Sequence, residues 1–107
     1  MKVFKFGGAS VKNAEAVKNV ARIIERYQNE PLLVVVSAMG KTTNALEKIL
    51  KEFIDGEPGL EQSIKDLKAF HFNILEELYK GEDPSAYHQL EDLFLQFEWF
   101  FELGEKD

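Results

Sequence analysis

The sequence predicts an α/β fold, in which residues 1–55 form a βαβα unit and residues 56–107 form two long helices. Two short apolar runs, at residues 3–6 and 32–36, each end in a turn of small residues that is followed by helical periodicity. Because strands that alternate with helices favour parallel pairing, the first half predicts a parallel sheet.

The first strand ends at Gly7 and Gly8, and Asn13 is placed to cap the helix that follows. Pro31 marks the turn into the second strand. Residues 32–36 are continuously apolar, so we expect both strands to be buried, with helices on both faces of the sheet. The apolar stripe predicted for the first helix consists of Val17, Val20, Ala21, Ile24 and Tyr27.

A right-handed crossover between the strands would place both turns at one edge of the sheet, where ligands of open α/β sheets bind. We therefore expect Lys5, the Gly7-Gly8 turn and the turn at residues 37–44 to face one site. Thr42 or Thr43 is expected to cap the next helix. Its predicted stripe is Leu46, Ile49, Leu50 and Phe53, and it ends before Gly56, Pro58 and Gly59.

The second half predicts two helices separated by a stop at Gly81, with Asp83 as cap and Pro84 in the first turn of the second helix. The stripes are Leu60, Ile64, Leu67, His71, Ile74, Leu75 and Leu78 in the first helix, and Tyr87, Leu90, Phe94, Phe97 and Phe101 in the second. Since Leu93, Trp99 and Phe100 widen the apolar surface of the last helix, we expect further chain or a second subunit to pack on it.

Composition narrows the class of protein. A chain of 107 residues forms one modest domain, and the absence of cysteine excludes disulfides and thiolate metal sites. Without an apolar leader or a membrane-length run, we expect a cytoplasmic protein with no membrane partner. Residues 1–55 hold 9 Lys and Arg against 6 Asp and Glu, which suits an anionic ligand, whereas residues 56–107 hold 4 against 13, which disfavours nucleic acid.

Several common site patterns are missing. Gly40-Lys41-Thr42 ends like a P-loop, but Val35 stands where that pattern requires glycine. The first turn lacks the third glycine of the dinucleotide fingerprint. His71 and His88 have no partner at metal-ligand spacing, and the adjacent carboxylates lie on polar helix faces, so we predict no metal site and no catalytic carboxylate pair.

The two glycine-containing turns predict a site that binds an anion. Glycine lets the backbone approach a ligand closely, and the N–H groups and positive dipole end of a following helix favour phosphate or carboxylate. Lys5-Phe6-Gly7-Gly8-Ala9-Ser10-Val11, taken with residues 34–39 and 42–46, resembles the N-terminal part of an aspartokinase, of the amino acid kinase family. The resemblance is strong over residues 1–54, and residues 56–107 match only as the variable helical insertion of the family.

The resemblance implies part of a three-layer α/β/α sandwich that phosphorylates the side-chain carboxylate of L-aspartate with ATP and Mg²⁺, the first step in making lysine, threonine and methionine. Lys5 matches the catalytic lysine that lies against the transferring phosphate. Gly7, Gly8 and Ser10 match phosphate-binding positions, and Ser37 and Thr43 match substrate-binding positions. Ala9 stands where the family usually has threonine.

The resemblance also implies partners that these residues do not include: the remainder of the kinase domain, which would hold most of the ATP and Mg²⁺, and regulatory ACT domains. We expect the complete protein to be a homo-oligomer and the isolated chain to have no turnover. Two alternatives stay open, namely another amino acid kinase that acts on glutamate, carbamate or a nucleotide, and a non-enzymatic module that binds an anion or a protein partner.

Overall fold

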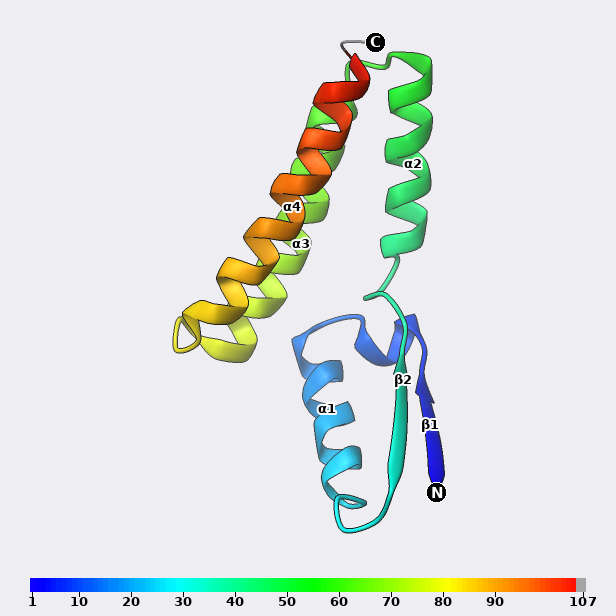
Figure 1. The fold of residues 1–107 in the computed structure, drawn as a ribbon, viewed down its shortest axis with the longest axis vertical. Coiled ribbons are helices and arrows are strands. Elements are labelled where there is room, and N and C mark those ends of the chain that lie inside the picture. The colour runs from blue at the N-terminus through cyan, green and yellow to red at the C-terminus, as the bar shows by residue number, and fades with distance from the viewer. Residues whose placement is uncertain (106–107) are drawn as a thin grey trace. The chain divides into compact units, whose positions relative to one another are not determined.

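The computed structural model describes the backbone of residues 1–105 and the side chains of residues 1–102. The chain forms two compact units, Met1–Asn44 and Ala45–Asp107. The elements, labelled in Figure 1, are β1 (Lys2–Phe6), the 3₁₀ helix η1 (Gly8–Val11), α1 (Ala14–Glu25), β2 (Leu32–Val36), α2 (Thr42–Asp55), α3 (Leu60–Tyr79) and α4 (Pro84–Glu105).

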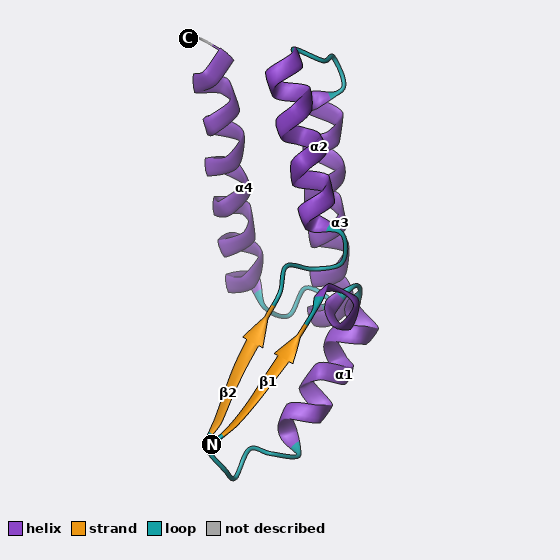
Figure 2. Cartoon of the chain, turned by 90° about the vertical axis from the view of Figure 1, so that its right-hand side faces the viewer, coloured by secondary structure: helices purple, strands orange, loops and turns teal. Residues whose placement is uncertain are grey.

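The first unit is built on a parallel pair of strands, as predicted. β1 and β2 pair in a register that joins Lys2 to Leu32 and Phe6 to Val36. Helix α1 lies along one face of this pair (Figure 2), and Phe6, Val11 and Val20 form the buried centre of the contact. Because the strands are parallel, their carboxyl ends lie at the same edge of the sheet.

The other face of the sheet is uncovered among residues 1–102, so the described part of the chain supplies the expected helix on one face only. Leu33, Val35 and Val3 are 49%, 46% and 59% exposed. Their side chains alternate with those that contact α1, because successive residues of a strand point to opposite faces. The continuous apolar run in β2 therefore reflects a surface that nothing in residues 1–102 covers.

Helix α1 has the predicted N-terminal cap, but the face that packs on the sheet differs slightly from the prediction. The Asn13 side chain accepts a hydrogen bond of 2.8 Å from the Ala16 N–H, which caps the helix. Val17, Val20 and Ile24 contact the sheet, but Ala21 is exposed and Ile23 packs on the cluster in its place. The contact face is thus rotated toward Ile23, whose larger side chain gains more from burial than alanine does.

The second unit is a three-helix cluster. Ile49 from α2, Ile64 and Leu67 from α3, and Phe94 and Phe101 from α4 form its buried core. The two predicted helices are present, and Figure 1 shows α3 and α4 side by side and running in opposite directions. The predicted stripes of these two helices supply most of the core.

Helix α2 packs differently from the expectation. The sequence grouped it with the βαβ unit through residue 55, whereas in the structure its residues from Ala45 onward belong to the second unit. Only part of its predicted stripe is covered, since Leu46 and Leu50 are 40% and 52% exposed while Ile49 is buried. Its apolar surface is wider than the single face that α3 and α4 cover.

Glycine and capping side chains end and begin the helices of the second unit. Gly56 follows α2 with a φ of 65°, a left-handed conformation that favours glycine. After α3 this conformation begins one residue earlier than predicted, at Lys80, and continues at Gly81. Asp83 caps α4 as predicted, because its carboxylate accepts a hydrogen bond of 3.1 Å from the Ser85 N–H.

His71 is a structural histidine, as expected. Its Nδ1 lies 2.9 Å from the Leu67 carbonyl oxygen within α3, and its ring packs edge-on against Phe70 and Phe94. Over the part of the chain that the structure describes, no helix is both long and apolar enough to cross a membrane.

Candidate functional site

The candidate site lies at the edge of the sheet where β1 and β2 end. Phe6 closes β1 opposite Val36, which closes β2, so both chain exits leave from one place. The first turn runs from Gly7 through η1, and the second turn runs from Ser37 to the start of α2 at Thr42.

The two turns are hydrogen-bonded to each other. The Ser37 N–H donates to the Phe6 carbonyl oxygen at 2.9 Å, and the Gly40 N–H donates to the Gly8 carbonyl oxygen at 3.2 Å. These bonds extend the pairing of the strands past their ends. The structure therefore brings the two predicted turns together, as the sequence led us to expect.

The two adjacent glycines of the first turn have different surroundings. A Cβ atom on Gly8 would stand 2.6 Å from the Gly40 carbonyl oxygen and 3.6 Å from the Ala38 carbonyl oxygen, so only glycine fits there. A Cβ atom on Gly7 would meet nothing within 4 Å. Gly8 is thus required by the second turn, and the backbone at Gly7 is open to an approaching ligand.

Lys5 lies on the open face of the sheet. Its side chain is exposed. Lys5 pairs in register with Val35, and both residues lie on the face opposite to α1. Among residues 1–102 it forms no ion pair. An ammonium group without a carboxylate partner next to a glycine turn is suited to hold an anion.

Ser10 and Ser37 are exposed, and each also makes a hydrogen bond within its own turn. The Ser10 N–H donates to the Gly7 carbonyl oxygen at 3.0 Å, which closes the first turn and leaves the hydroxyl group available. The Ser37 hydroxyl donates to the Ala38 carbonyl oxygen at 2.7 Å, so it could accept a hydrogen bond from a ligand as it stands but would have to break this bond to donate one.

Thr42 and Thr43 differ in their surroundings, although the sequence predicted either of them as the cap of α2. Neither caps α2 in the predicted way, because the helix begins at Thr42 itself and the Thr42 hydroxyl donates to the Met39 carbonyl oxygen at 2.5 Å. Thr42 is 9% exposed, whereas Thr43 is exposed. The structural use of Thr42 was missed, and its only signal in the sequence was its place directly after a glycine turn.

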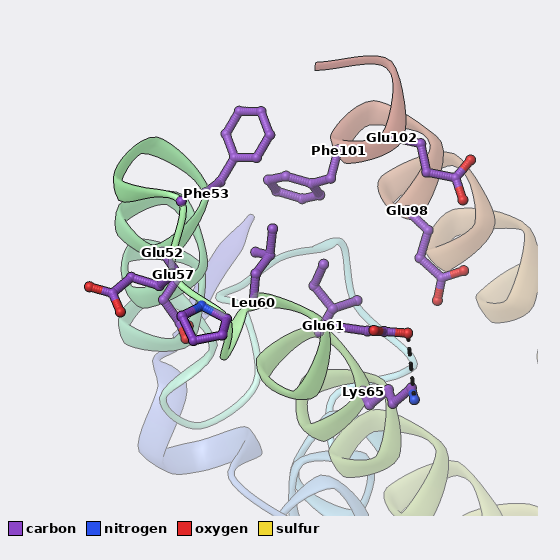
Figure 3. A pocket seen from close by; sticks show the side chains of 12 residues that line it. Glu52, Phe53, Glu57, Leu60, Glu61, Lys65, Glu98, Phe101 and Glu102 are labelled. Atoms are coloured by element: carbon purple, nitrogen blue, oxygen red, sulfur yellow. Dashed lines mark ion pairs between the residues drawn. The ribbon is translucent and has the colours of Figure 1, made fainter. Parts of the chain in front are cut away.

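A cavity of about 710 Å³ lies elsewhere, in the second unit, and contains none of the predicted site residues. Figure 3 shows Phe53 and Phe101 on its apolar side and several carboxylates around it, with Glu61 and Lys65 paired at 3.7 Å. Within the described residues no group of three or more acidic, histidine or cysteine side chains could hold a metal ion.

Comparisons with known proteins identify the family of the chain. The sequence profile of the amino acid kinase family matches residues 1–99. Aspartokinase 2, chloroplastic, of Arabidopsis thaliana is 40% identical over 79 residues, which are 71% of this chain and 14% of that protein. The aspartokinase of Bacillus sp. (strain MGA3) is 45% identical over 64 residues, 58% of this chain and 16% of that protein.

A third relative is the bifunctional aspartokinase/homoserine dehydrogenase of Buchnera aphidicola subsp. Acyrthosiphon pisum (strain APS), 45% identical over 62 residues, 57% of this chain and 8% of that protein. The chain thus spans less than a fifth of the length of these relatives. The resemblance to the N-terminal part of an aspartokinase is confirmed. The chain belongs to the amino acid kinase family.

Proposed function

We propose that this chain forms the phosphate- and substrate-contacting segment of an aspartate kinase within a three-layer α/β/α domain. The observation that carries the proposal is the joined pair of turns, with Gly7 open to a ligand and Lys5 unpaired among residues 1–102 beside it. The names of the relatives, all aspartokinases, favour aspartate over other acceptors. Glutamate, carbamate or a nucleotide is the alternative within the same family.

In the proposed reaction, a side-chain carboxylate oxygen of L-aspartate attacks the γ-phosphorus of ATP. The bond from that phosphorus to the bridging oxygen of ADP breaks, and the products are 4-phospho-L-aspartate and ADP. The carboxylate is already ionised, so no protein base has to remove a proton. Such a transfer requires positioning and charge stabilisation above all.

The residues of the two turns would divide this work. Lys5 would neutralise charge that develops on the transferred phosphoryl group, while Gly7, Gly8 and Ser10 would present backbone dipoles and a hydroxyl group to it. Ser37 and Thr43 would orient the aspartate. Mg²⁺ would compensate phosphate charge. Because the described residues hold no cluster of three or more acidic, histidine or cysteine side chains, we assign the metal, and with it the adenosine, to other parts of the kinase.

A chimera tests this function. Residues 1–55 of this chain would replace the matching segment of the Bacillus aspartokinase, and ATP-dependent hydroxamate formation would be measured with aspartate, glutamate and carbamate. We expect activity with aspartate, and none from the 107-residue chain alone. An inactive but folded chimera, or one that prefers another acceptor, would contradict the proposal. Turnover by the isolated chain would contradict the assignment of the nucleotide site to other residues.

A further inference from the structure

The second turn is held in place at two points, one where it contacts Gly8 of the first turn and one at Thr42. At the first point the Gly40 carbonyl oxygen occupies the space that a side chain on Gly8 would need, 2.6 Å from the ideal Cβ position. The same two residues share the hydrogen bond from the Gly40 N–H to the Gly8 carbonyl oxygen. The contact is between backbone atoms, which cannot move aside as a flexible side chain does.

The second point is the closure of the turn by Thr42. The Met39 carbonyl oxygen accepts from both the N–H of Thr42, at 3.1 Å, and its hydroxyl group, at 2.5 Å. Between them Gly40 has a φ of 56°, a conformation that most side chains disfavour. Two bonds to one carbonyl thus hold the turn in the shape that lets Gly40 reach Gly8.

Thr42 stands out in its burial. In the part of the chain that the structure describes, it is the one buried polar residue. A buried hydroxyl group is stabilising only with a hydrogen-bond partner, and here the partner is within the turn itself. The neighbouring Thr43 is exposed, and its hydroxyl group is available to a ligand. The Thr42 hydroxyl group is instead used in a hydrogen bond within the turn.

We infer that Thr42 and Gly8 are positioning residues, Gly8 in addition to the phosphate contact proposed above, and that they set the substrate side of the site in register with its phosphate side. The inference rests on the proposed function, because it uses the roles of Lys5 and Gly7 on one turn and of Ser37 on the other. Gly8 lies directly after Gly7, and Thr42 closes the turn that begins at Ser37. Loosening either anchor would let the two reacting groups drift apart, and a misplacement of about 1 Å lowers rates by roughly 100-fold.

Amide hydrogen exchange on the 107-residue chain tests the anchors without any need for catalysis. In Thr42→Val, which keeps the shape and removes the hydroxyl group, we expect the Gly40 N–H to exchange about fivefold faster, as for the loss of one typical hydrogen bond. Thr42→Ser should exchange like the wild type, and so should Thr43→Val. Unchanged exchange at Gly40 in Thr42→Val would overturn the role of Thr42.

The adjacent glycines give a matched pair for the other anchor. Gly8→Ala should accelerate exchange at Gly40, and Gly7→Ala should leave it unchanged, because Gly7 has room for a methyl group and a φ of −78° that alanine adopts readily. Equal effects of the two substitutions on Gly40 would overturn the role of Gly8.

Kinetics of the chimera then test positioning as opposed to folding. Thr42→Val should lower kcat by on the order of 10-fold with a smaller change in KM, and Thr42→Ser should restore it. Unchanged kcat and KM in Thr42→Val, in an active chimera, would overturn the inference and leave the proposed function standing. A chimera that is inactive with wild-type residues contradicts the proposed function, and amide exchange still decides whether the anchors exist.

Discussion

At the scale of single residues, Lys5 carries the clearest prediction. In the active chimera, Lys5→Ala should lower kcat/KM for aspartate by roughly 100-fold, as for removal of one preorganised donor to developing charge. Lys18→Ala, which removes an exposed lysine from α1, serves as the control for a loss of positive charge alone. A change within about threefold for Lys5→Ala, less than about 0.7 kcal/mol, would show that the ammonium group does not stabilise the transition state.

Tyr87 carries a prediction about pH. Its hydroxyl group donates a hydrogen bond to the Glu76 carboxylate, which raises the pKa of Tyr87, with smaller contributions from partial burial and from the nearby negative charge. Because the folded pKa lies above the unfolded one, this bond contributes to stability below the ordinary tyrosine pKa of about 10 and is lost as pH rises through the folded value.

Absorbance of tyrosinate as a function of pH measures the effect. Tyr87→Phe should remove a component that titrates above the ordinary tyrosine range. Unfolding by urea should show that the stability of the wild type falls faster with alkaline pH than that of Tyr87→Phe. If the component lost in Tyr87→Phe titrated within the ordinary tyrosine range, the bond to Glu76 would not persist in solution.

At the scale of elements, Asn13 shows how far a short pattern determines structure. Its side chain accepts the Ala16 N–H at the start of α1, so Asn13→Ala should lower the free energy of unfolding by about 1 kcal/mol. Asn19→Ala makes the same change at an exposed position within α1 and should not destabilise the chain, because alanine has the higher helix propensity. Urea denaturation followed by circular dichroism measures both, and equal losses would contradict the capping role.

The elements also show why the sequence predicts some features and not others. Caps, turns and stripes depend on residues close in sequence, and so Asn13, Asp83 and the stripe of α3 are found as expected. Coverage of a face depends on which other segment packs there. The open side of β2 and the exposed Leu50 could not be predicted for that reason, because an apolar run has the same composition whether covered or bare.

The candidate site also combines features that can be predicted from the sequence with features that cannot. The glycine turns and Lys5 could be selected from the sequence because small residues after an apolar run have a direct physical meaning. The distinction between Gly7 and Gly8 could not, since it depends on a carbonyl oxygen that lies 32 residues away along the chain, at Gly40. For the same reason the burial of Thr42 became visible only once the second turn was placed.

At the scale of the whole molecule, the main feature is apolar surface that remains in contact with water. In α4, Leu93, Trp99 and Phe100 are 63%, 56% and 64% exposed, on a helix whose sequence contains no lysine or arginine. Apolar side chains that are spread over several turns of one helix favour an additional contact, as the sequence suggested. Burial of each such side chain contributes about 1.5–3 kcal/mol of stabilising free energy, so a contact that covered them would be strongly favourable.

Charged substitutions on this surface test its state in the isolated chain. Leu93→Lys with Phe100→Lys should change the free energy of unfolding by less than about 0.5 kcal/mol, because neither side chain is buried in the monomer. The same pair should weaken concentration-dependent sedimentation and reduce the fluorescence of an apolar dye. Gln96→Lys adds a charge to exposed α4 surface without removing apolar area, and it should alter association less. If the double variant unfolded more easily by 2 kcal/mol or so, the two side chains would belong to the core of the folded chain, and the apolar surface would already be covered within one molecule.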